Sequence, residues 1–371
     1  MAWCSPELEF SKDVFSPGEE VTGRAWVSTK KDMTARNVTI TFSGKTVTAW
    51  KQGEKQSEIG NTTCKRSEEV YVNMSQENTF PAGDYEWNFS FELPKDCPAS
   101  FEGYYGFIRY YVKLNIDVPN WPDTHFTKAV TVSPTIDLNL IPGANGPTSV
   151  QLENPVQACC GCIPVSVLKK GNVLFTLSAP TLGYLSGQVV TVTGLVENHS
   201  TRTLQAIEGS LHRMVIYRED LEKITGGIIK MSSNPNRRDD SSNSQRQIVN
   251  YSSKEEECQV SPGFAKEFTF SFEIPPVVAT IRNSKFISVE YFVRITADVE
   301  GYSCSQAMAD MNIVVGNVPL ADAGGIEALF SSALAPTFRK TDAANRWSYD
   351  LNKAFHPLVP YFGNKPETPE A

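Results

Sequence analysis

The sequence contains a long internal repeat. Residues 89–94 read Phe-Ser-Phe-Glu-Leu-Pro, and residues 270–275 read Phe-Ser-Phe-Glu-Ile-Pro, at an offset of 181 (270 − 89). The same offset pairs four more residues with identical or similar ones, namely Tyr110 with Tyr291, Val112 with Val293, Lys113 with Arg294 and Asp117 with Asp298. A repeat that keeps its register over this distance predicts two copies of one structural unit, each with its own core.

A second pair of matching segments lies nearer the start of each half. Residues 15–22 correspond to residues 184–191 at an offset of 169 (184 − 15). The difference between the two offsets means that the second half carries additional loop residues. The polar segment 232–244, rich in Asn, Arg, Asp and Ser, is expected to be a mobile loop there.

The repeated unit is predicted to form β-strands. Apolar residues alternate with polar ones at 38–42, 87–93 and 268–274, which is typical of strands with one face on a core and one in water. Helical periodicity is nearly absent, and the only candidate is the short segment 326–334. Two copies of a unit with several such strands favour tandem β-sandwiches over barrels.

The length of the chain agrees with two domains. At 371 residues it is too long for one compact core and sufficient for two. The Gly- and Pro-rich segment 141–147 is expected to be the hinge. The expected organisation is an N-terminal sandwich at 1–145, a linker at 146–158, a C-terminal sandwich at 159–318, and a largely extended or disordered tail at 319–371.

The charge and the apolar pattern exclude several function classes. A net charge of −8 opposes binding to nucleic acid, which requires clustered cations. The N-terminus lacks the pattern of a secretory signal, and no run of about 18 apolar residues occurs. The sequence therefore predicts a soluble, unsecreted protein whose eight cysteines are reduced thiols.

A series of motifs carries a family resemblance. The chain reads F-E-L-P at 91–94, P-A-S-F-E-G at 98–103, and Y-G-F-I-R-Y-Y-V-K at 105–113, followed by I-D-L-N at 136–139. This series is similar to the alpha-arrestin pattern, and the resemblance covers roughly residues 5 to 318. It implies an all-β fold of two tandem arrestin-like, immunoglobulin-like β-sandwich domains with a short C-terminal tail.

The resemblance also implies a function. Alpha-arrestins are adaptors that bind cytosolic parts of membrane proteins and bring ubiquitin ligases to them for endocytic sorting. It implies a cytoplasmic protein recruited to the plasma membrane and to endosomes, associated with the membrane only peripherally, with no cofactor and no catalytic activity. An arrestin-fold structural subunit of an endosomal sorting coat, similar to retromer, is the alternative.

The tail departs from the family pattern. Alpha-arrestin tails carry P-P-x-Y, which WW domains bind as a polyproline helix with a tyrosine anchor. The nearest match here is Ala335-Pro336-Thr337-Phe338, in which the first proline and the tyrosine are both replaced. Residues 356–361 also contain prolines and a tyrosine, but their spacing differs from that of P-P-x-Y. The departure weakens the expectation of WW-domain ligases as partners and leaves the expectation of membrane-protein cargo unaffected.

Three cations are candidate contacts for cargo. Strand alternation places Arg109 and Lys113 on one sheet face with Tyr111, and Lys12 falls on an expected early strand. Cations grouped on a sheet face form charge-assisted hydrogen bonds to acidic or phosphorylated segments. In the classical arrestins a basic surface of the N-terminal domain binds receptor phosphates, and the resemblance places Arg109 and Lys113 on the matching strand. The alternative is an ordinary solvated sheet face.

The cysteine cluster and the histidines offer no complete metal site or catalytic motif. Cys159, Cys160 and Cys162 lack a nearby fourth ligand for tetrahedral zinc, which leaves S-acylation at a membrane or buried reduced thiols as their roles. The four histidines lie in no catalytic motif, and no phosphate-binding glycine motif occurs. The sequence therefore predicts a non-enzymatic protein without metal or cofactor.

Overall fold

The protein consists almost entirely of β-strands, which confirms the all-β fold class. The computed structural model describes residues 4–52, 55–72, 78–119, 124–157, 169–218, 244–300, 306–320, 336–341 and 355–363. Within these residues the only helical segment is the short 3-10 helix η1 (Leu138–Leu140). No helix in these ranges has the length and apolar character required to span a membrane. The expected helix at 326–334 lies outside the described residues.

The N-terminal domain is a sandwich of two main sheets. One sheet has the order β1-β3-β8, and the other has the order β2-β11-β10-β5-β6 with β9 beside β10. A small sheet pairs β4 with β7. The strands are β1 (Cys4–Phe10), β2 (Val14–Phe15), β3 (Glu20–Thr29), β4 (Met33–Ala35), β5 (Asn37–Gln52), β6 (Lys55–Val72), β7 (Asn78–Phe80), β8 (Gly83–Glu92), β9 (Phe101–Gly103), β10 (Gly106–Asp117) and β11 (Thr124–Val132).

The C-terminal domain has two sheets of the same kind. Their orders are β12-β13-β15-β18 and β14-β20-β19-β16-β17. The strands are β12 (Thr148–Gln157), β13 (Lys169–Ala179), β14 (Gly183–Leu185), β15 (Val189–Ser200), β16 (Leu204–Arg218), β17 (Ser244–Val260), β18 (Ala265–Glu273), β19 (Ile287–Val299) and β20 (Gln306–Gly316).

The two domains share one connectivity, as the repeat predicts. Strands β1, β3 and β8 correspond to β13, β15 and β18, and the short parallel pair β2 and β11 corresponds to β14 and β20. The additional strand of the second copy is β12, which pairs with β13 from Thr148 to Gln157. The structure therefore differs from the expected linker at 146–158, because most of those residues belong to the C-terminal sandwich.

The repeated tyrosines explain part of the sequence repeat. The Tyr110 hydroxyl donates a 2.8 Å hydrogen bond to the Pro98 carbonyl, and the Tyr291 hydroxyl donates a 2.7 Å bond to the Val278 carbonyl. Both side chains are buried. Each tyrosine therefore fixes the loop that leaves the preceding repeated strand, at the same place in both domains.

The repeated turns at 15–22 and 184–191 also have one geometry. Gly18 and Gly187 both have positive φ, 83° and 94°, which favours glycine. In each turn a side chain accepts a hydrogen bond from the backbone amide three residues earlier: Glu19 from Ser16, and Gln188 from Leu185. The turn S-P-G-E and its copy in the second domain are thus stabilised by the same local hydrogen bond.

The expected hinge is packed against the C-terminal domain. Ala144 is fully buried, and its carbonyl accepts a 3.0 Å bond from the Gly183 amide. Leu138 and Ala144 form a small apolar cluster with Leu185 and Val314. The segment 141–147 is therefore a surface turn whose apolar residues are held by the second domain. The expected mobile loop at 232–244 lies outside the described residues, apart from Ser244 at the start of β17.

The described part of the tail is ordered as two paired strands. These are β21 (Thr337–Lys340) and β22 (Leu358–Tyr361), which pair antiparallel. The Leu358 amide donates to Thr131 Oγ1 of the N-terminal domain, and the Phe362 amide donates to the Ser186 carbonyl of the C-terminal domain. The described tail residues are thus extended, and they lie against both domains.

The two domains and the tail meet around a small cavity. Its volume is about 20 Å³, and its lining includes Thr131, Val278, Asn317 and Val359. This volume is about that needed for one water molecule. Val359 of β22 is buried at this seam between the domains. Both domains and the tail therefore contribute to the lining of one small cavity.

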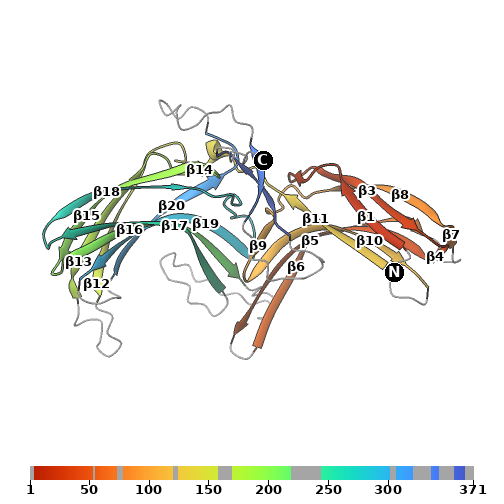
Figure 1. Ribbon diagram of the computed structural model, residues 1–371, viewed down its shortest axis with the longest axis horizontal. Coiled ribbons are helices and arrows are strands. Elements are labelled where there is room, and N and C mark those ends of the chain that lie inside the picture. Colours follow the sequence, from red (N-terminus) through yellow and green to blue (C-terminus); the bar gives the residue numbers. More distant parts are fainter. Residues whose placement is uncertain are drawn as a thin grey trace, which may run out of the picture.

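The two domains join end to end into a shallow arch (Figure 1). The sheets that contain β5 and β10 and those that contain β16 and β19 lie on the concave side of this arch (Figure 1). The sheets β1-β3-β8 and β12-β13-β15-β18 lie on the convex side. We call these the inner side and the outer side of the arch.

Replacement of the two repeated tyrosines tests whether the copies are held in the same way. Tyr110→Phe and Tyr291→Phe each remove one hydroxyl donor and leave a carbonyl without its partner, so each variant should lower the free energy of unfolding by about 1–2 kcal/mol. Urea denaturation measures the loss. Tyr104→Phe, at an exposed tyrosine, is the control. A loss in one domain only would show that the second hydroxyl does not stabilise its loop.

Candidate functional site

The inner face of the N-terminal sheet carries the residues that sequence alternation placed together. Along β10, the residues Tyr110, Val112 and Leu114 are buried in the core. Alternate residues of a strand point to opposite faces, so Arg109, Tyr111 and Lys113 belong to the inner face. Arg109, Tyr111 and Lys113 therefore share one sheet face, as the alternation predicts.

Arg109 is nevertheless not a surface residue. It is 1% exposed. Its Nε donates to Glu102 Oε1 at 2.5 Å and its Nη2 donates to Glu102 Oε2 at 2.9 Å, a two-bond ion pair. The guanidinium also lies 4.0 Å from the centre of the Phe107 ring. We therefore correct the expectation that Arg109 contacts cargo, because its charge is neutralised inside the protein.

The Glu102–Arg109 pair connects neighbouring strands near the seam. Glu102 belongs to β9, and its register partner on β10 is Phe107. Burial raises the pKa of the Glu102 carboxyl, while the hydrogen bond and charge of Arg109 oppose that rise and the charge of His356 from the tail opposes it further. The pair therefore occupies a position where the N-terminal domain and the tail approach each other.

Lys113 remains accessible on the inner face. It is partly exposed, and its register partners are Thr41 on β5 and Thr127 on β11. Within the ranges that the structure describes, no carboxylate forms an ion pair with it. Nearby, Lys45 lies 5.5 Å from the centre of the Tyr111 ring. The described inner face here thus presents cations, an aromatic ring and hydroxyls.

Lys12 is not on a strand, contrary to expectation. It lies in the connection between β1 and β2. Its Nζ forms a 2.7 Å ion pair with Glu19, both side chains being nearly half exposed, and lies 4.9 Å from the centre of the Phe15 ring. The hydrogen bond from Lys12 lowers the pKa of Glu19. Lys12 therefore supports the repeated turn at 15–22.

The outer face of the N-terminal domain has the opposite charge. Strand register places on it one arginine, Arg24, whose partners are Glu9 at 2.6 Å and Glu86 at 3.9 Å. The carboxylates of that face, assigned from the registers of β1, β3 and β8, are Glu7, Glu9, Glu20, Asp84, Glu86 and Glu92. An acidic partner would be repelled from this face and attracted by the cations of the inner face.

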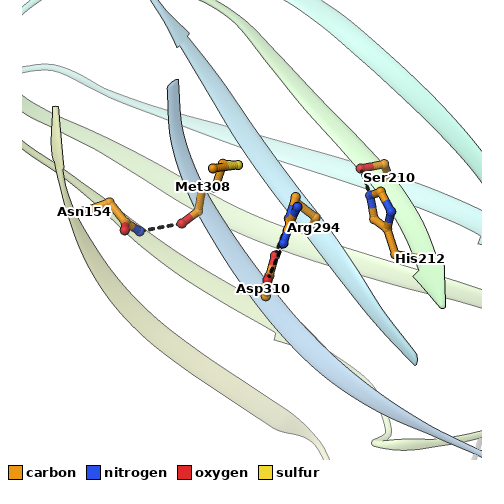
Figure 2. A network of polar contacts seen from close by, with 6 residues as sticks. All are labelled: Asn154, Ser210, His212, Arg294, Met308 and Asp310. Atoms are coloured by element: carbon orange, nitrogen blue, oxygen red, sulfur yellow. Dashed lines mark hydrogen bonds and ion pairs between the residues drawn. The ribbon is translucent and has the colours of Figure 1, made fainter. Parts of the chain in front are cut away.

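The inner face of the C-terminal domain holds a polar network (Figure 2). Arg294 forms two hydrogen bonds to Asp310 on the neighbouring strand, at 2.7 and 2.8 Å. His212 points toward Ser210, with 2.7 Å between Nε2 and Oγ (Figure 2). Its ring stacks on Phe292 with 5.1 Å between centroids. Burial lowers the pKa of His212, and the charge of Arg294 lowers it further while Asp310 opposes this.

The remaining candidate residues are the three clustered cysteines and the tail motif at 335–338, and several of them lie outside the described residues. Cys159, Cys160 and Cys162 lie outside the described residues, as does Ala335. Pro336 precedes β21, and Thr337 and Phe338 belong to it. Phe338 is 54% exposed. Cys97 is buried, Cys258 is partly buried, and neither forms a disulfide.

Sequence reasoning missed the partner of Arg109. Glu102 appeared only as a residue of the P-A-S-F-E-G motif, while the structure places it in β9 beside β10. The available signal was the short interval between the two residues, since two strands joined by a tight turn bring opposite charges together. The burial of both could not be predicted from alternation alone.

Comparison with known proteins identifies both domains. The family model described as "Arrestin (or S-antigen), N-terminal domain" matches residues 4–139, and the model "Arrestin (or S-antigen), C-terminal domain" matches residues 169–320. The first range contains the strands of the N-terminal sandwich, and the second contains those of the C-terminal sandwich from β13 to β20.

Relatives with a similar sequence occur in several animals. Arrestin domain-containing protein 1 of Mus musculus is 28% identical over 213 residues, which is 57% of this chain and 46% of the mouse protein. Arrestin domain-containing protein 17 of Caenorhabditis elegans is 27% identical over 209 residues, 52% of this chain and 47% of the worm protein. Arrestin domain-containing protein 4 of Mus musculus is 22% identical over 328 residues, 85% of this chain and 71% of the relative. The chain spans about half the length of the first two.

Breaking the buried Glu102–Arg109 ion pair should lower the free energy of unfolding. Arg109→Met leaves the Glu102 carboxylate buried without its cation, and the free energy of unfolding should fall by about 3–5 kcal/mol. The double variant Glu102→Leu with Arg109→Met should recover most of that loss. Chemical denaturation measures both, and Lys113→Met, on the partly exposed cation of the same strand, should stay within about 0.5 kcal/mol. An equally small effect for Arg109→Met would contradict the buried pair.

The lowered pKa of His212 predicts a pH dependence of stability. The folded state favours the neutral imidazole, so its contribution is full above the unfolded pKa of about 6.5 and is lost as pH falls through the lower folded pKa. Wild-type protein should therefore lose more unfolding free energy between about pH 8 and about pH 5 than His212→Gln does. Equal curves for wild type and His212→Gln would show that His212 is not linked to folding.

Proposed function

This chain belongs to the arrestin family and is related to the arrestin domain-containing proteins, and from that membership we propose that it is a non-enzymatic adaptor for membrane proteins. The adaptor binds their cytosolic segments with the inner side of the arch. The observation that carries this assignment is the charge difference between the two sides of the N-terminal domain. Its outer side carries six carboxylates on the faces of β1, β3 and β8. Its described inner side presents Lys45 and Lys113, and the carboxylate of Asp117 on that side is paired with Arg36.

Lys113 is the central contact in this proposal. It has no carboxylate partner in the described ranges, so it is available for a charge-assisted hydrogen bond to an acidic or phosphorylated side chain. Tyr111 and the hydroxyl of Thr41 lie on the same face and add polar and aromatic contacts. Arg109 and Lys12 take no part, because each is bound to a glutamate of this chain.

The tail is the proposed link to the ubiquitin machinery. Pro336 and Phe338 are exposed and resemble half of a WW-domain ligand. A WW domain requires a polyproline helix, whereas residues 337–340 form a strand paired with β22. Binding of a WW-domain ligase therefore requires these residues to leave that pairing, which agrees with a weakened ligase partner.

We place the adaptor in the cytoplasm, recruited to the plasma membrane and endosomes by its cargo. S-acylation at Cys159, Cys160 and Cys162 is a further proposed means of peripheral attachment. Coupling to endocytic sorting follows from the same family membership. Each of these statements depends on cargo binding, which is the step to test first.

Proximity labelling and pull-down in cells test the proposal. Wild-type protein should capture receptors or transporters, Lys113→Glu should lose most of them, and Lys31→Glu, at an exposed lysine after β3, should keep them. Phe338→Ala should keep the cargo and lose WW-domain ubiquitin ligases. Capture of coat subunits without membrane-protein cargo would reject the adaptor and support a structural subunit of a sorting coat.

A further inference from the structure

The inner face of the C-terminal domain carries an apolar patch. Strand register places Met214 opposite Ile248 on β17 and opposite Glu290 on β19, and Ile216 lies two residues further along β16. Their immediate neighbour Val215 is buried in the core, so Met214 and Ile216 point to the inner side. Ile248 is 48% exposed. Met214 and Ile216 are partly exposed. We call Met214, Ile216 and Ile248 the inner patch.

The fold does not require these apolar residues. The two domains share one register, so Met214 occupies the position that Lys45 occupies in the N-terminal copy, and His212 occupies that of Ser43. The partner of Lys45 on the next strand is Thr62, whereas the partner of Met214 is Ile248. The N-terminal copy thus forms the same sheet with polar residues at positions where the C-terminal copy is apolar. An exposed apolar patch with a polar rim is typical of an interaction site.

Two arginines border the inner patch on the side nearer the N-terminal domain. Arg246 is exposed and pairs in register with Ile216. Arg218 is partly exposed and donates a 2.6 Å hydrogen bond to Ser288. Neither has a carboxylate partner among the described residues, whereas Arg24, Arg36 and Arg294 each have one. The patch therefore has uncompensated positive charge at one end.

The opposite end of the patch is neutral or acidic. Arg294 is paired with Asp310 there (Figure 2), and Glu290 lies beside Met214. Further along the same face are Glu208 and Asp298. These carboxylates oppose an anionic lipid surface, which would cover the whole face. They permit a narrow ligand that places its negative charges only over Arg246 and Arg218.

The spacing along the strands fits an extended chain. Residues two apart on a strand are separated by about 7 Å, so the steps from Met214 to Ile216 and from Ile216 to Arg218 each have that length. Side chains on one face of an extended peptide recur at the same interval. A peptide with one apolar residue followed at alternate positions by two acidic residues can therefore place these over Ile248, Arg246 and Arg218.

We propose that the inner patch binds an extended peptide segment in which an apolar side chain is followed, at alternate positions, by acidic or phosphorylated ones. This proposal rests on the adaptor function and names the chemistry of the cargo. The apolar side chain packs on Met214 and Ile248. The acidic side chains form charge-assisted hydrogen bonds with Arg246 and Arg218.

Fluorescence anisotropy with the full chain tests the site. The probe is a labelled serine-rich peptide with one leucine followed at alternate positions by two glutamates. Ile248→Ser removes an apolar contact and should weaken binding roughly tenfold, and Arg246→Gln should weaken it by roughly the same factor. Val189→Ser is the matched control, because Val189 is also 48% exposed but lies in the other sheet of this domain. Its affinity should equal that of wild type.

Control peptides identify the chemistry of recognition. Replacing the leucine by serine should weaken wild-type binding and have no further effect on Ile248→Ser. Replacing both glutamates by glutamine should remove the salt dependence of binding. Unchanged binding by both Ile248→Ser and Arg246→Gln would overturn the proposed site. Tighter binding to phosphatidylserine vesicles than to the peptide, lost in the same variants, would show that the partner is a membrane surface.

Failure of this inference is distinguishable from failure of the adaptor function. If wild-type protein ignores the peptide but still captures membrane proteins in cells, the inner patch is rejected and the adaptor remains. If it captures no membrane protein either, the adaptor function itself is rejected.

Discussion

Each strand of a β-sandwich has two faces, and only one of them can enter the core. This constraint divides the residues of the protein into those that hold the fold and those that a partner can reach. In both domains the core face contains the repeated residues, such as Phe91 with Phe272 and Tyr110 with Tyr291. The accessible face of the two larger sheets lies on the inner side of the arch, and there the copies differ, with Lys45 in one and Met214 at the same position in the other. The shared core explains the common architecture, and the differing inner faces provide two chemistries for binding along one continuous side.

A buried ion pair of the N-terminal domain lies near the tail, which contacts both domains. Glu102 and Arg109 neutralise each other inside the protein, close to the position where the tail strand β22 passes from Thr131 of one domain to Ser186 of the other. Removing a cation from such a pair is costly because the remaining carboxylate has no water to replace it. The contacts of the tail join the two domains, so a ligand that touches both inner faces meets a surface whose two parts are held together.

Much of the fold followed from the sequence, because its signals are local or repeated. Alternation identified the strands around Phe42, Phe91 and Phe272, and the repeat indicated two sandwiches. The family resemblance then named the fold, and the family models agree. The additional strand β12 was missed because Gly143 and Pro147 indicated a linker, and pairing with β13 is a long-range contact without a local signal. Arg109 was assigned the correct face but the wrong environment, since alternation does not reveal that Glu102 covers it. The inner patch was missed because Met214 and Ile216 flank the core residue Val215 and resemble part of one buried run.

The central claim is that partners bind to the inner side of the arch. Site-specific photo-crosslinking in cells tests it most directly, with a photoreactive amino acid placed in turn at Lys113 and Ile248 on the inner side, and at Glu86 and Val189 on the outer side. Crosslinks to the cytosolic segments of membrane proteins should form from the two inner positions and not from the two outer ones. Equal or stronger crosslinking of such proteins from Glu86 and Val189 would contradict the account.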